Sequence, residues 1–163
     1  MSQFVLQKLR DRFGAGILAT HSDHGDDTAV VEPKILLEVV RFLREDPDLE
    51  FNMLIDLFGV DRQGLPDNDP RFEVVYHFYS VARKRHRVRI KCRLPETDPV
   101  VDSITSVWPG ADWYERECWD MFGIRFRGHP NLRRILLYEQ FEGHPLRKDY
   151  PVHKRQPIIG TPH

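Results

Sequence analysis

Apolar residues in the first half of the chain recur at two spacings, one typical of helices and one typical of strands. Helical spacing covers residues 3–13 and the broad apolar stripe that runs from Pro33 to Pro47. Between these segments, the apolar or β-branched runs 17–20 and 28–31 flank a cluster of turn-forming residues, which predicts a hairpin.

Three strand-like runs follow the second predicted helix, at residues 51–60, 71–81 and 86–94. The predicted order of elements is therefore α-β-β-α-β-β-β. Helices and strands in this order favour an α+β fold, a two-layer sandwich with the helices on one face of a mixed or antiparallel sheet.

The run 86–94 has the clearest alternation, because one face is apolar and the other cationic. Such a row of cations could hold nucleic acid, acidic lipid or an acidic protein, but a solvated outer face of an antiparallel sheet is the commoner arrangement. We predict no nucleic-acid partner. The cations are Arg87, Arg89, Lys91 and Arg93, and the apolar residues between them are Val88, Ile90, Cys92 and Leu94.

A short helix is predicted over residues 113–122, with Asp112 before it as a cap and Gly123 after it as a terminator. Four-residue spacing predicts ion pairs of Arg116 with Asp112 and with Asp120. Three carboxylates on this helix could serve acid–base catalysis, but a polar rim around a packed helix is the commoner arrangement. These carboxylates are Glu115, Glu117 and Asp120.

Regular periodicity fades beyond the short helix, although the run 135–138 predicts one brief strand. The Gly-His-Pro sequence of residues 128–130 is repeated at 143–145, and a basic pair follows each copy. Proline restrains the residue before it and glycine permits turns, so these segments are rigid and irregular. We predict an α+β domain over residues 1–125 and an extended C-terminal segment, residues 126–163, that docks on a partner.

The composition of the 163 residues excludes several classes of protein. Two cysteines, Cys92 and Cys118, are too few for a disulfide framework or for the usual ligation of an iron–sulfur cluster. No apolar run reaches the roughly 18 residues of a membrane span, and the first residues lack a secretory signal, which predicts a cytoplasmic setting. The net charge of −1 combines 8 basic and 15 acidic residues in 1–80 with 16 basic and 10 acidic residues in 81–163.

Candidate catalytic and metal-binding patterns are few. The chain has no nucleophile elbow, no phosphate-binding glycine loop and no His-Glu-x-x-His motif. His129 and His144 are a candidate ligand pair, but no carboxylate or thiolate motif at ligand spacing accompanies them. A histidine and aspartate cluster in the predicted hairpin turn could bind a metal, although solvated turn residues are the commoner arrangement. This cluster comprises His21, Asp23, His24, Asp26 and Asp27.

Three ordered motifs give the chain a resemblance to a known family. They are Glu115-Arg116-Glu117-x-x-Asp120-Met121-Phe122-Gly123-Ile124, Gly128-His129-Pro130-x-Leu132-x-Arg134-Ile135-Leu136, and Glu142-Gly143-His144-Pro145-Leu146-Arg147-Lys148-Asp149-Tyr150-Pro151. Through them the chain closely resembles the C subunit of the proton-pumping NADH:quinone oxidoreductase, respiratory complex I. The residues after Tyr150 are the part least similar to the family.

The resemblance implies a non-catalytic, structural subunit of the hydrophilic arm, with no catalytic residue, metal or cofactor of its own. Such a complex passes electrons from NADH through FMN and iron–sulfur clusters on other subunits to a quinone, coupled to proton translocation. The resemblance also implies a bacterial protein held peripherally at the cytoplasmic face of the inner membrane. An equivalent subunit of a membrane-bound hydrogenase or formate hydrogenlyase complex is the alternative.

The resemblance also implies partners. In this family the C-terminal segment lies along the D subunit and contacts other connecting subunits of the arm. The signature and interface positions so implied are Glu115, Arg116, Glu117, Asp120, His129, Arg133, Arg134, His144, Arg147, Asp149 and Tyr150.

Overall fold

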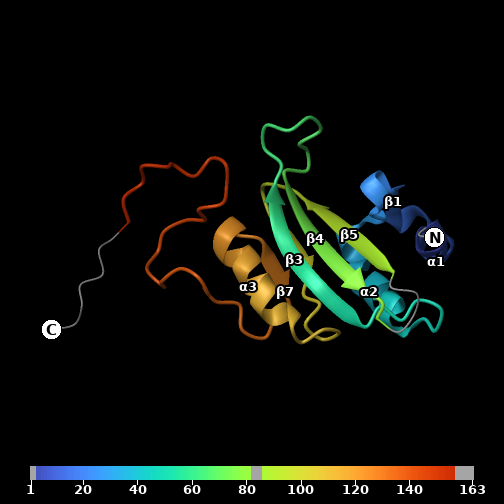
Figure 1. Cartoon of the computed structure of the whole chain (residues 1–163). Coiled ribbons are helices and arrows are strands. Elements are labelled where there is room, and N and C mark those ends of the chain that lie inside the picture. Colours follow the sequence, from blue (N-terminus) through green and yellow to red (C-terminus); the bar gives the residue numbers. More distant parts are fainter. Residues whose placement is uncertain (1–2, 82–85, 157–163) are drawn as a thin grey trace.

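A mixed five-stranded sheet forms the centre of the computed structural model, which describes residues 3–81 and 86–156 (Figure 1). The order across the sheet is β1-β2-β5-β4-β3, in which β2 and β5 run parallel and the other neighbours run antiparallel. This confirms the predicted α+β class and the predicted hairpin. The strands are β1 (Ile17–His21), β2 (Thr28–Val31), β3 (Met53–Asp61), β4 (Phe72–Tyr79) and β5 (Arg87–Leu94).

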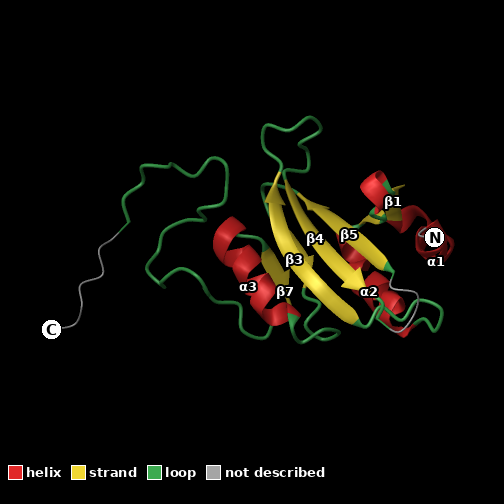
Figure 2. Cartoon of the chain, in the orientation of Figure 1, coloured by secondary structure: helices red, strands yellow, loops and turns green. Residues whose placement is uncertain are grey.

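Three α-helices cover one face of this sheet, as predicted. Helix α2 lies behind the strands in Figure 2, and α3 runs beside the edge strand β3. Gly59 of β3 pairs with Val74 of β4 on the core face of the sheet. A Cβ atom at Gly59 would lie only 2.7 Å from the ring of Phe122, the last residue of α3. Glycine at this position therefore lets α3 pack close to the sheet. The helices are α1 (Gln3–Phe13), α2 (Leu36–Glu45) and α3 (Ala111–Phe122), and the 3-10 turns are η1 (Gly14–Gly16), η2 (Asp23–Gly25) and η3 (Pro33–Ile35).

The core lies between the sheet and the helices because the apolar positions follow the period of each element. In β5 the alternation predicted from the sequence holds, with Val88, Ile90 and Cys92 buried. Cys92 and Cys118 are both free thiols within this core. Burial raises the pKa of each thiol, so both stay protonated and pack as small apolar groups.

A second, two-stranded parallel sheet was not predicted from the sequence. It pairs β6 (Val100–Asp102) with β7 (Arg125–Arg127), which are joined through α3 and bury Val101 and Phe126. Strands of three residues are too short to show a period of two. The predicted end of the domain, after residue 125, falls inside β7.

Two local predictions are wrong. Helix α3 begins at Ala111 after Gly110 and has no side-chain cap, so Asp112 lies in the first turn instead of before it. The run 135–138 forms no strand: residues 135–137 are bends, and their backbone N–H groups donate to one carboxylate. Within residues 3–81 and 86–156, no helix is both long and apolar enough to cross a membrane.

Candidate functional site

Asp120 of α3 is the centre of a polar network that fixes the C-terminal segment on the domain. Its side chain is fully buried, and Oδ1 accepts a 2.6 Å bond from Nη1 of Arg134. Oδ2 accepts the backbone N–H groups of residues 135–137 at 2.9–3.0 Å. Burial alone would raise the pKa of Asp120, but these hydrogen bonds outweigh it and hold the pKa below its usual value. Asp120 is therefore an ionised anchor for an irregular stretch of backbone.

Two arginines extend this network along the segment. Arg134 also donates to the carbonyls of Phe141 and Gly143, at 2.8 and 3.1 Å. Arg116 of α3 donates to the carbonyls of Arg133 and Arg134, at 3.2 and 3.1 Å. The predicted pairing of Arg116 within its own helix is therefore wrong, because the guanidinium reaches the C-terminal segment instead.

The second Gly-His-Pro motif caps the C-terminal end of α3. The last carbonyls of a helix lack partners within it, and here Asp120 O accepts from His144 Nδ1 at 3.0 Å. The carbonyls of the next two residues accept from the Leu146 N–H at 3.1 Å and from Arg147 Nε at 2.6 Å. Gly123 ends the helix at φ +73, and a Cβ there would lie 2.6–2.7 Å from Arg147 and His144. The predicted role of Gly123 is confirmed.

The first Gly-His-Pro motif lies at the opposite end of α3. Nδ1 of His129 accepts the Asn131 N–H at 3.0 Å, so Nε2 carries the hydrogen and donates to the Asp112 carbonyl at 3.2 Å. Because His144 binds at the C-terminal end of the helix, His129 and His144 do not form a ligand pair. Both motifs instead hold the segment against the two ends of one helix.

Glu115 is a fully buried carboxyl next to His129. Its Oε1 accepts the Ile104 N–H at 2.7 Å, and its Oε2 lies 4.0 Å from His129 Nε2. Burial raises the pKa of Glu115 to about 7. The hollows found in the described part of the chain are not lined by Glu115, so its contacts describe a structural acid and give no support to acid–base catalysis.

Arg71 forms a second link between domain and C-terminal segment, and the sequence analysis missed it. Its guanidinium makes paired bonds to Asp61, at 3.0 and 2.8 Å, and to Asp149, also at 3.0 and 2.8 Å. Glu96 accepts a further bond at 2.6 Å, and Asp61 also accepts the Lys148 N–H at 2.8 Å. One sequence signal could have revealed this site. Leu57, Gly59 and Asp61 alternate along β3 and share its core face, so the sequence places a carboxylate where an apolar residue is expected.

The remaining positions of the signature lie nearer the surface. Glu117 and Arg133 are exposed. Tyr150 stacks on Phe141 with ring centroids 6.2 Å apart.

A groove of about 540 Å³ lies between α3 and residues 132–139. The residues that line this groove, together with exposed Trp113 of α3 and exposed Leu136, are called the α3–tail surface. The lining comprises Arg116, Trp119, Leu132, Arg133, Arg134, Leu137, Tyr138 and Glu139.

Most of the cationic residues of β5 have carboxylate partners. Nη2 of Arg89 lies 2.6 Å from Asp26, and Nζ of Lys91 lies 3.1 Å from Glu73. Arg93 lies 3.3 Å from the carboxylate of Asp67. In the hairpin turn Asp26 is thus engaged by Arg89, and in the described part of the chain no three His, Cys, Asp or Glu side chains are grouped to hold a metal.

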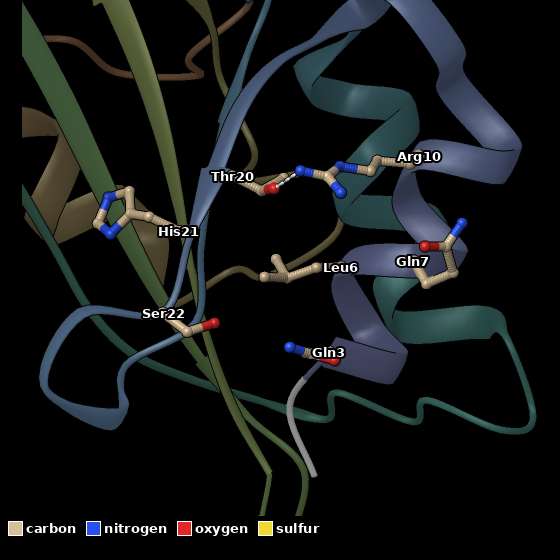
Figure 3. Close-up of a pocket in the computed structure, with 7 residues that line it drawn as sticks. All are labelled: Gln3, Leu6, Gln7, Arg10, Thr20, His21 and Ser22. Atoms are coloured by element: carbon tan, nitrogen blue, oxygen red, sulfur yellow. Dashed lines mark hydrogen bonds between the residues drawn. The ribbon is translucent and has the colours of Figure 1, made fainter.

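A polar hollow of about 390 Å³ lies between α1 and β1 (Figure 3). Arg10 of α1 reaches across it and donates to the Thr20 hydroxyl, whereas the neighbouring His21 side chain points away from α1. Its lining, among the described residues, includes no carboxylate and no thiol. The lining also holds His21 and Ser22; the Ser22 hydroxyl donates to Asp27 at 2.6 Å, and Nδ1 of His21 lies 2.9 Å from the Asp23 carboxylate.

Comparison with known proteins places the chain in a family. Residues 29–156 match the family model of the respiratory-chain NADH dehydrogenase 30 kDa subunit. The chain belongs to this family. It is 52% identical over 144 residues to the NADH-quinone oxidoreductase C 2 subunit of Rhizobium etli, a match that covers 88% of this chain and 74% of that protein.

Two further relatives of this 30 kDa subunit family bear on its architecture. A solved trypsin-resistant fragment of Nqo5 superimposes with a TM-score of 0.69 at 31% identity, over 80% of this chain and 98% of that fragment. The NADH-quinone oxidoreductase C/D subunit of Methylococcus capsulatus is 45% identical over 159 residues, which cover 93% of this chain and 26% of that longer protein.

Proposed function

We propose that the chain is a structural, non-catalytic subunit in the peripheral arm of an NADH-quinone oxidoreductase. Family membership and the 52% identity to a C subunit of that enzyme support this assignment. NADH oxidation, FMN, the iron–sulfur clusters and quinone reduction then belong to other subunits. The role of this chain is to hold those subunits in register.

The observation that carries the proposal is a fixed C-terminal segment with large apolar side chains turned outward. The networks of Asp120 and Arg71 hold its backbone, yet Leu136 is 62% exposed and Leu146 is 53% exposed. On the adjoining helix Trp113 is 66% exposed. Exposed tryptophan beside arginine is typical of protein interfaces. A segment that is already ordered loses little further entropy when a partner binds.

The partner is inferred to be chiefly the D subunit, with other connecting subunits of the arm beside it. The Methylococcus relative supports this choice, because its name assigns the C and D subunits to one chain. The predicted division into an α+β domain, residues 1–125, and a docking segment, residues 126–163, stays part of the proposal, with the boundary moved to the end of β7 at Arg127. The chain would then sit at the cytoplasmic face of a bacterial inner membrane, held there by its partners.

Co-purification of tagged full-length chain from detergent-solubilised membranes tests the proposal. Wild type should recover the D subunit and other complex I subunits. Leu136→Asp should lower that recovery at least about tenfold, because it places a charge in an apolar contact. Leu18→Asp is the matched control, since Leu18 is 55% exposed on β1 at the far edge of the sheet and should leave recovery unchanged.

Different results would contradict the proposal. Recovery of a nickel–iron hydrogenase in place of complex I subunits would assign the chain to the related class of complexes. Recovery of complex I subunits by Leu136→Asp at the wild-type level would remove the docking role of the α3–tail surface.

A further inference from the structure

The face of the sheet opposite the three helices is a second candidate interaction surface. It faces the viewer in Figure 2, where α2 lies behind the strands. Two hollows of about 510 and 230 Å³ lie on it and share His77 and Arg89 in their linings, so they adjoin each other across β3, β4 and β5. We call this the outer-face groove.

The outer-face groove has an apolar side and a cationic side. Phe58 of β3 is 39% exposed, and Leu65 of the loop after β3 is 47% exposed, although both are large apolar residues. The opposite side is the row of cations on β5. An exposed phenylalanine beside arginine is a combination enriched at protein interfaces.

The charges of the groove leave a small positive excess. Its linings contain five arginine or lysine side chains and three carboxylates. Glu73 is shared by Lys91 at 3.1 Å and Arg93 at 3.5 Å. Within the described residues, Arg87 has the Tyr79 ring as its neighbour and no carboxylate partner. Asp67, outside these linings, lies 3.3 Å from Arg93 and 3.8 Å from Arg62, so the remaining excess suits one carboxylate and is too small for the six to ten phosphate contacts typical of nucleic-acid binding.

We propose that the outer-face groove binds an acidic, partly apolar segment of another subunit of the complex. The apolar residues of that segment would pack on Phe58 and Leu65, and a carboxylate would pair with Arg87, which has no carboxylate partner among the described residues. This inference rests on the proposed function and adds a second interface to it, on the face of the sheet away from α3. The subunit would thus be held between neighbours on two sides.

Photocrosslinking in the assembled complex tests this inference. Benzoylphenylalanine at position 65 should crosslink to another subunit, and the mapped peptide should contain aspartate or glutamate next to apolar residues. The same group at position 136 reports on the α3–tail surface in parallel. Arg87→Glu should lower the crosslink from position 65 about fivefold and leave the crosslink from position 136 unchanged. Arg125→Glu is the matched control, an exposed arginine on β7, and should change neither crosslink.

The two positions separate failure of this inference from failure of the proposed function. A complex that crosslinks from position 136 but not from position 65 would overturn the second interface and keep the first. A peptide without carboxylates, or RNA bound at position 65, would overturn the chemistry proposed for the groove. A chain that recovers no complex I subunit at all would overturn the proposed function, and this inference with it.

Discussion

Replacement of Arg71 by methionine should lower the free energy of unfolding by about 3 kcal/mol. Methionine keeps a long unbranched side chain but removes the guanidinium that Asp61, Asp149 and Glu96 share. Asp149 and Glu96 are 49% and 62% exposed, so water replaces much of what they lose. The Asp61 side chain is only 2% exposed and would be left as a buried carboxylate without its cation. Breaking a buried ion pair costs about 3–5 kcal/mol, and the N–H bonds that Asp61 keeps favour the lower value.

The pH dependence gives the same prediction a second, independent signature. Burial alone would raise the pKa of Asp61, but hydrogen bonds from Arg71, Lys148 and Gln63 lower it from 3.8 to about 2. A lowered carboxyl pKa stabilises the fold above pH 3.8, and this stabilisation, about 2 kcal/mol, is lost as the pH falls toward 2. Because Arg71→Met removes the main favourable partner, the difference between wild type and variant should be largest at pH 7 and smaller at pH 3.

Urea unfolding of the full-length chain, followed by tryptophan fluorescence at pH 7 and pH 3, measures both effects. The matched control is Arg125→Met, because Arg125 and its partner Asp98 are 60% and 64% exposed. An exposed pair contributes about 0–1 kcal/mol, so the control should stay close to wild type at both pH values. A loss below about 1 kcal/mol at pH 7 for Arg71→Met, or a loss equal to the control, would refute the reasoning.

Three further predictions follow from the same network. Glu115→Gln should raise stability at pH 8 by about 3 kcal/mol and leave it unchanged at pH 4, because a folded pKa of about 7, against 4.5 unfolded, makes ionisation oppose folding as the pH rises. Urea unfolding at both pH values measures this, and a variant weaker than wild type at pH 8 would contradict it. Asp120→Asn should speed amide hydrogen exchange at residues 135–137 at least about tenfold and leave β4 unchanged, since the N–H groups of these residues lose their ionised acceptor. Recovery of the D subunit through the α3–tail surface should change less than about threefold between 50 and 300 mM salt, because backbone carbonyls already engage Arg116 and Arg134 and leave Trp113 and Leu136 for apolar contact; a steep salt dependence would contradict that view.

The main elements of the fold could be predicted because each leaves a period in the sequence. The stripe of α2 and the alternation of β5 follow directly from which side chains face the core. The parallel pairing of β2 with β5 left no such trace, since it joins segments about 60 residues apart. Likewise β6 and β7 are too short to show a period.

Asp120, Arg116 and Arg134 could be selected from the sequence as signature residues, but the partners of their side chains could not be predicted. Asp120 and Arg116 stand four apart on one helix, so local spacing predicted a pair between them. In the structure the Asp120 carboxylate is taken by Arg134 and by three N–H groups 15–17 residues ahead. Arg71 and Asp61 belong to no motif, and their link to Asp149 spans 78 residues. Local patterns report which face a residue occupies and carry no information on such distant partners.

The basic excess of residues 81–163 acquires a physical reason from these contacts. Among the described residues, 128–156 contain no helix or strand, so their carbonyls and N–H groups need other partners. An arginine offers five N–H donors in a rigid fork, and Arg116, Arg134 and Arg147 use theirs on backbone carbonyls of α3 and of this segment. Those cations therefore hold the segment in shape. On its outer side Leu136 and Leu146 are exposed among mostly polar and charged side chains, so a partner would meet apolar contacts inside a polar rim.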